Sequence, residues 1–259
     1  MKNHYLLECC VDCAASALEA EKGGADRLEL CSGLVIGGLT PSASLLAQVK
    51  SKVHLPVNVL IRPRFGDFLY TREEMELMRS DITLLKEYGA DGFVIGCLRA
   101  DGTLDIEGLT FLMEACGSLP ITLHRAFDMC RDPFTSLEAA RNLGITTILS
   151  SGQKNTCLEG LALLKALHEK AVQSTAHPVQ IMAGAGMDAQ SISHFLRQTD
   201  ITAFHMSGKK VTDSDMTYRN PMVSMGTANL DEYSIWQTDA EEVHKAKVEL
   251  LNYFPASEK

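Results

Sequence analysis

The 259-residue sequence predicts an α/β protein folded as a single (β/α)8 barrel of the TIM type. Short apolar runs of strand length recur along the chain, and stretches with apolar residues at i, i+3 and i+4 lie between them. Such alternation implies a parallel sheet, and eight repeats suit a closed barrel better than an open doubly wound sheet. The strand-like runs span residues 5–10, 27–31, 57–64, 92–97, 121–127, 146–152, 179–186 and 203–208.

Helix start and stop signals support the same alternation. The segment TREE at 71–74 has the pattern of a capping box, and Asp132 followed by Pro133 is typical of another helix start. Gly-Ala-Asp recurs at 24–26 and 89–91, where the glycine would end a helix. An open sheet is the alternative, but the first strand is followed by ECCVDCAAS, which lacks the GxGxxG of a dinucleotide-binding fold.

The length predicts one domain over residues 1–259, because it is ordinary for a barrel and large enough to bury a core without disulfides. The alternation breaks at residues 209–238, a polar, turn-rich segment that precedes the C-terminal helix. Irregular segments of this length usually act as a lid, a subunit contact or a cover for the barrel mouth.

Charge and hydropathy exclude several classes of partner. The formal charge of -9 and the pI near 5.4 leave no basic stripe, so neither nucleic acid nor an anionic membrane is expected to bind. No stretch approaches the length of a membrane span, and the start MKNHYLLECCVDC is too short and too acidic for a signal peptide. We expect a cytoplasmic protein.

The eight cysteines are scattered through apparent strands and helices, which in a reducing compartment indicates free thiols. Cys10 and Cys13 are separated by two residues, but no second pair of this kind follows, so a zinc knuckle is disfavoured. Most of these cysteines are expected to fill the core.

Polar side chains gather at the predicted carboxyl ends of the strands, where barrels carry their sites. A carboxylate inside a barrel is costly unless it is paired, so we expect one buried network with Arg62 as the counter-charge. Its expected members are Glu8, Glu29, Arg62 and His124, with Arg64, Arg125 and Asp128 nearer the rim. The alternative is a layer of salt bridges that only supports the fold.

Two glycine-containing turns suggest an anion site. MAGAG follows the seventh strand and HMSGK the eighth, where barrels often bind phosphate through backbone N–H groups. The alternative is that glycine only permits a tight turn. The candidate anion-binding residues are Arg64, Gly184, Gly186, Ser207 and Gly208.

Cys10 and Cys31 lie in the same phase on strands that should be neighbours. Two converging thiolates suit a soft ion such as Cu(I), although two small residues packed inside a barrel are an equal alternative. Cys9 should face the other way, toward the helices.

The segments LECCVD, GGADRLELCSGLVIGGLTPS, IRPRFGDFLYT, HRAFDM, LSSGQ, IMAGAGM and YRNPMVSMG occur in this order. With them the chain resembles the CutC family of copper homeostasis proteins, from about residue 6 to residue 235. The resemblance implies a (β/α)8 barrel, a cytoplasmic location, a homodimer, and a Cu(I) role for Cys10 and Cys31.

Two functional hypotheses follow. The first is a cytosolic copper homeostasis protein that binds Cu(I). The second is a barrel enzyme acting on a small phosphorylated or carboxylated substrate, with Glu8 or Glu29 as acid or base, His124 as its partner, and Asp128 close by. Arg62 and Arg64 would hold the anion. The thiols favour the first hypothesis, and the carboxylates, arginines and imidazole favour the second, because Cu(I) needs none of them.

Overall fold

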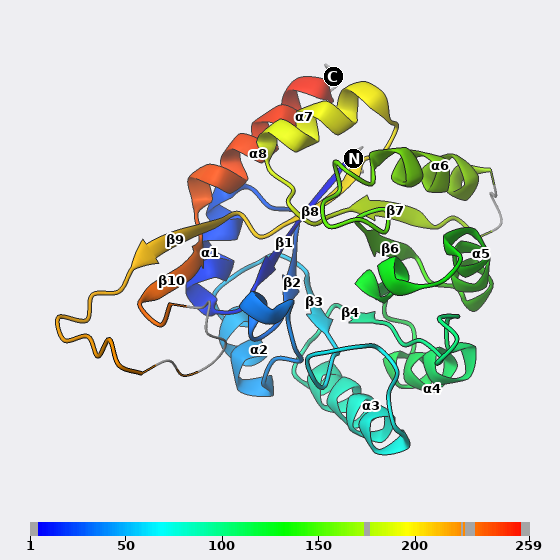
Figure 1. Ribbon diagram of the computed structural model, residues 1–259, viewed down its shortest axis with the longest axis horizontal. Helices are drawn as coiled ribbons and strands as arrows, with labels where there is room; N and C mark the ends of the chain where they lie inside the picture. Colours follow the sequence, from blue (N-terminus) through cyan, green and yellow to red (C-terminus); the bar gives the residue numbers. More distant parts are fainter. Residues whose placement is uncertain (1–4, 174–176, 224, 226–230, 255–259) are drawn as a thin grey trace.

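The computed structural model describes residues 5–173, 177–223, 225 and 231–254. Eight parallel strands, β1 to β8, close into a barrel in chain order, and the helices lie around its outside (Figure 1). The predicted TIM-type barrel is confirmed. The barrel strands are β1 (Leu6–Val11), β2 (Arg27–Leu30), β3 (Val57–Leu60), β4 (Gly92–Ile95), β5 (Ile121–Leu123), β6 (Thr147–Ser150), β7 (Gln180–Ala183) and β8 (Ala203–Met206).

The predicted helix signals are confirmed at residue level. The helices are α1 (Ala14–Gly23), α2 (Ala43–Lys50), α3 (Arg72–Glu87), α4 (Ile106–Cys116), α5 (Pro133–Leu143), α6 (Leu161–Val172), α7 (Ala189–Gln198) and α8 (Ala240–Tyr253). Thr71 and Glu74 form a reciprocal capping box on α3, and the Asp132 carboxylate caps α5. Gly24 ends α1 at φ 93°, a left-handed conformation that favours glycine.

Two strands end earlier than the sequence predicts. β3 stops at Leu60 instead of residue 64: the Arg62 N–H donates to the Thr40 hydroxyl instead of a strand, and Pro63 has no N–H to resume the pairing. β5 stops at Leu123, and a short 3-10 helix, η2 (Arg125–Met129), replaces the rest of the expected strand. The side chain of His124 accepts a hydrogen bond from the Ala126 N–H and so caps this turn.

Residues 209–238 are less irregular than expected. Their two ends form antiparallel strands, β9 (Lys209–Asp213) and β10 (Ser234–Thr238), and this arm extends away from the barrel (Figure 1). Residues 224 and 226–230 of the segment lie outside the described residues. Strand pairing at the base of the arm therefore replaces part of the predicted loop.

The period-two alternation decides which side chains enter the barrel. On β1, Leu7, Cys9 and Val11 belong to the main apolar core, so Cys9 faces the helices as predicted. Cys31 instead packs with Leu60 in a small separate cluster. In the described residues all eight cysteines are free thiols, and no helix is long and apolar enough to cross a membrane.

Candidate functional site at the mouth of the barrel

A cavity of about 450 Å³ opens at the carboxyl ends of the strands. This is where (β/α)8 barrels carry their sites, and its size is in the range of pockets for small ligands. Eight of the residues predicted from the sequence lie on its wall: Cys10, Glu29, Cys31, Arg62, His124, Arg125, Gly186 and Ser207. His205, Met206, Lys209 and Trp236 also line it.

Glu8 is fully buried, and two basic side chains neutralise it. Arg27 Nε lies 2.5 Å from Glu8 Oε2, and His205 Nδ1 lies 2.8 Å from Glu8 Oε1. Burial alone would raise the pKa of Glu8, but Arg27 and His205 outweigh it and lower that pKa. Glu8 is therefore a carboxylate held between two cations.

Arg62 is not the counter-charge that the sequence analysis expects. Its guanidinium donates to backbone carbonyls, including those of Gly38 at 3.1 Å and Gly66 at 3.0 Å, and lies 5.1 Å from the centre of the Phe68 ring. These carbonyls come from loops that fold over the barrel mouth, and Gly38 and Gly66 have positive φ angles. The single network of glutamates and arginines is wrong, because Arg27 takes the role assigned to Arg62.

Glu29 is buried beside this ion pair without a strong partner of its own. No hydrogen bond to its Oε2 atom is found. Burial and the charge of Glu8 raise the pKa of Glu29 to about 7, although His205 and Arg27 oppose that rise. Because Glu29 lines the cavity, its free oxygen is available to a ligand.

His205 lies between the two carboxylates and the thiol of Cys10. Its Nδ1 is 2.8 Å from Glu8 Oε1, and both Glu29 and Cys10 influence its charge. Burial alone would lower the pKa of His205, but Cys10, Glu29 and Glu8 raise it well above its ordinary value. The ligand atoms of Glu8, Glu29 and His205 lie within 4.8 Å of one another, but Arg27 already occupies Glu8, which disfavours a divalent cation there.

Sequence reasoning left both His205 and Arg27 out of the site. The signal was present, because Arg27 shares its strand phase with Glu29, and His205 pairs in register with Glu8. Arg27 stands at the first position of its strand, whereas barrel sites are expected at strand carboxyl ends. His205 was visible at a strand end but had no identified partner.

His124 is a neutral hydrogen-bond donor. Its Nδ1 accepts from the Ala126 N–H at 3.1 Å, so the ring proton is on Nε2. Burial and the nearby cation of Arg62 lower the pKa of His124 to about 3. The ring packs against Phe68 with 5.0 Å between centroids, and no hydrogen-bond partner of Nε2 is found.

Three buried polar atoms of the cavity residues thus have no partner: Glu29 Oε2, Arg62 Nε and His124 Nε2. Buried polar groups in native proteins are nearly always hydrogen-bonded to protein, water or ligand. Glu29 lies next to the last residue of β2, Arg62 lies two residues after β3, and His124 directly follows β5. Three unpartnered polar atoms on residues of one cavity indicate a binding site for a polar ligand.

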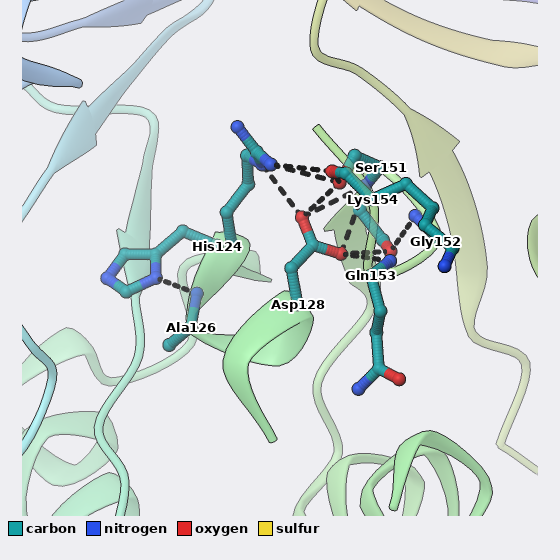
Figure 2. Close-up of polar contacts among 9 residues, drawn as sticks. His124, Ala126, Asp128, Ser151, Gly152, Gln153 and Lys154 are labelled. Atoms are coloured by element: carbon teal, nitrogen blue, oxygen red, sulfur yellow. Dashed lines mark hydrogen bonds and ion pairs between the residues drawn. The ribbon is translucent and has the colours of Figure 1, made fainter. Parts of the chain in front are cut away.

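Asp128 lies outside the cavity wall. It accepts hydrogen bonds from Ser150 Oγ at 2.6 Å and from the Ser151 N–H at 3.0 Å, and it pairs with Arg125. Figure 2 shows the His124 ring turned away from this cluster. Asp128 fixes the loop after β6, and the structure does not bring it to the other predicted catalytic residues.

The predicted anion residues divide into two groups. Gly186 and Ser207 line the cavity, whereas Arg64 is engaged by Glu74 at 2.6 Å and by Asp67 at 2.9 Å outside it. Two of the glycines serve packing. A Cβ atom at Gly184 would lie 2.6 Å from Leu149, and one at Gly208 would lie 2.7 Å from Val243.

The two predicted cysteines both line the cavity. Cys10 Sγ donates to the Met206 carbonyl at 3.5 Å, and Cys31 Sγ to the Val11 carbonyl at 3.6 Å. Burial raises the pKa of Cys31, and the neighbouring Cys10 and Glu29 raise it further. Thiolates are soft ligands, so this pair of cysteines fits Cu(I); the Met206 side chain belongs to the main apolar core, as Cys9 does.

The family model described as CutC family matches residues 5–210. The chain belongs to the CutC family. Among curated CutC proteins, the human copper homeostasis protein cutC homolog is 47% identical over 242 residues, which cover 93% of this chain and 87% of that protein. The CutC family protein of Pasteurella multocida is 42% identical over 247 residues, covering 95% of this chain and 99% of its own.

Solved structures agree with the CutC barrel. A candidate copper homeostasis protein CutC from Streptococcus agalactiae superposes with a TM-score of 0.72 at 30% identity, covering 78% of this chain and 98% of its own. A Rubisco-like protein from Rhodopseudomonas palustris has a TM-score of 0.63 at 13% identity, covering 99% of this chain and 66% of its own. The second likeness concerns the fold alone.

Proposed function

We propose that this CutC protein acts in copper homeostasis by binding one Cu(I) ion between Cys10 and Cys31. The observation that carries the proposal is the convergence of two buried thiols on one cavity wall from paired strands. Cu(I) prefers soft sulfur ligands, and the two thiolates would supply them. The two thiol protons would leave when the ion binds.

An anaerobic titration against a chromophoric Cu(I) competitor tests this proposal. The parent protein is expected to bind one equivalent, and the Cys10→Ser, Cys31→Ser double variant to lose that binding. A matched control replaces Cys13 and Cys130 by serine; these residues lie off the cavity wall, so the control should bind as the parent does. Equal Cu(I) affinity in the parent and the Cys10, Cys31 variant would remove these thiols from the site.

We also propose a cytoplasmic location and a homodimer. Free buried thiols support a reducing compartment. The arm carries exposed apolar side chains, including Tyr218 and Met222 at 73% and 87% exposure, which supports a contact with a second copy. Sedimentation equilibrium should give twice the 28.3 kDa chain mass, and the mass of one chain would contradict the dimer.

A second candidate function is recognition of a small carboxylate or phosphate compound. It is favoured by the unpartnered donors Arg62 Nε and His124 Nε2 on the cavity wall. Oxalate, a small planar dianion, is a suitable calorimetric probe. We expect the parent protein to bind oxalate. The Arg62→Lys variant, which keeps the charge but removes Nε, should bind it more weakly. Equal heats for the two proteins would contradict it.

A further inference from the structure

The unpartnered atoms of the cavity have complementary roles. Arg62 Nε and His124 Nε2 can only donate, because guanidinium has no acceptor and the His124 proton is fixed on Nε2 by the Ala126 N–H. Phe68 lies against both side chains, 5.1 Å from the guanidinium carbon and 5.0 Å from the imidazole centroid. The two donors are thus held beside one apolar ring.

Glu29 provides the opposite function in the same cavity. Its Oε2 has no hydrogen-bond partner, and its residue is 94% buried, with 6% relative exposure. The neighbouring carboxylate Glu8 is different, because it is fully engaged by Arg27 and His205. Of these two carboxyl groups, Glu29 is the one free to receive a proton from a ligand.

We propose that this cavity catalyses proton abstraction next to a carbonyl group, with Glu29 as the base and Arg62 and His124 as donors to the enolate oxygen. The inference rests on the second candidate function and adds a reaction to it. The C–H bond next to the carbonyl breaks, and its proton goes to Glu29 Oε2. The electron pair forms the C=C bond of the enolate, and the carbonyl π pair moves onto oxygen. Return of the proton restores the carbonyl and needs no oxidant or reductant.

The wall also defines the class of substrate. A cavity of about 450 Å³ accommodates a small metabolite, and Lys209 lines it with its Nζ 3.3 Å from the centre of the Trp236 ring. The Lys209 ammonium would bind a carboxylate or phosphate at the end of the substrate away from the carbonyl. The expected substrates are small 2-oxo acids or phosphorylated hydroxyketones.

Exchange of carbon-bound hydrogen with solvent tests the step. Metal-free protein is incubated in D2O with pyruvate, 2-oxobutyrate or dihydroxyacetone phosphate, and proton NMR follows loss of the signal next to the carbonyl. We expect protein-dependent exchange with at least one probe. Glu29→Gln should slow it by about 100-fold or more, and Arg62→Lys by about 100-fold, the usual effects of removing a base or an oxyanion donor.

The controls separate loss of fold from loss of chemistry. Glu114→Gln, on the exposed face of α4, is the matched control and should exchange at the parent rate. Glu29→Asp keeps a carboxylate at shorter reach and should fall between the parent and Glu29→Gln. No exchange with any probe, or an unchanged rate in a folded Glu29→Gln protein, would overturn the proposal. Oxalate binding without exchange would leave the second candidate function standing and remove only the reaction.

Discussion

Replacing Arg27 by methionine is expected to lower the free energy of unfolding by about 3–5 kcal/mol. The change removes the cation that lies 2.5 Å from Glu8, a side chain with no solvent exposure. His205 then remains as the only close basic partner of that carboxylate among the described residues. Leaving a buried charge short of its counter-ion is among the most damaging single changes in a protein. Urea unfolding followed by circular dichroism measures the effect.

Two further variants make the Arg27 result interpretable. Arg72→Met breaks an exposed ion pair with Glu76 on α3 and should cost only about 0–1 kcal/mol. Removing both charges, as Glu8→Gln with Arg27→Met, should recover much of the loss, because the buried carboxylate is gone and His205 can lose its proton. If Arg27→Met lowers the free energy of unfolding no more than Arg72→Met does, the Arg27–Glu8 ion pair does not stabilise the protein.

The second large effect concerns acid stability and His124. Below about pH 6.5 the imidazole binds a proton in the unfolded chain, but in the folded protein its pKa is lowered to about 3. Unfolding therefore takes up a proton at His124. As the pH falls, this uptake favours the unfolded chain, and the free energy of unfolding decreases. The expected slope is about 1.4 kcal/mol per pH unit between about pH 6 and pH 3.

His124→Asn isolates this contribution. Asparagine retains an acceptor for the Ala126 N–H but has no titrating ring. The stability difference between parent and variant should shrink or reverse as the pH is lowered from 6.5 to 4.5, since Glu29 and the other groups titrate in both proteins. A difference that stays constant over this range would mean that His124 binds its proton over the same pH range in the folded and the unfolded chain.

The sequence predicts the barrel well because its signals are local. Helix caps such as Thr71 and Asp132 depend on neighbours three residues away, and strand faces follow from alternation along six residues. The same alternation correctly sends Glu29, Cys10 and Cys31 to the cavity and Cys9 to the helices.

The partners of the polar groups are harder to predict because they depend on loops and on strand register. Arg62 is held by carbonyls of loop residues such as Gly38, whose backbone has φ 83°. Nothing in the local pattern indicates where those carbonyls point. Asp128 was expected just after a strand, but it sits in a 3-10 helix that replaces the end of that strand. Its contacts with Ser150 and Ser151 follow from this turn, which periodicity does not reveal.

X-ray absorption at the copper edge of the protein loaded with one equivalent of Cu(I) tests the central proposal most directly. Sulfur scatterers in the first coordination shell are expected, because Cys10 and Cys31 are the soft ligands at the cavity. Replacing Cys10 by serine should reduce the sulfur contribution and weaken binding. A first shell of nitrogen and oxygen alone, unchanged by that substitution, would contradict a Cu(I) site between Cys10 and Cys31.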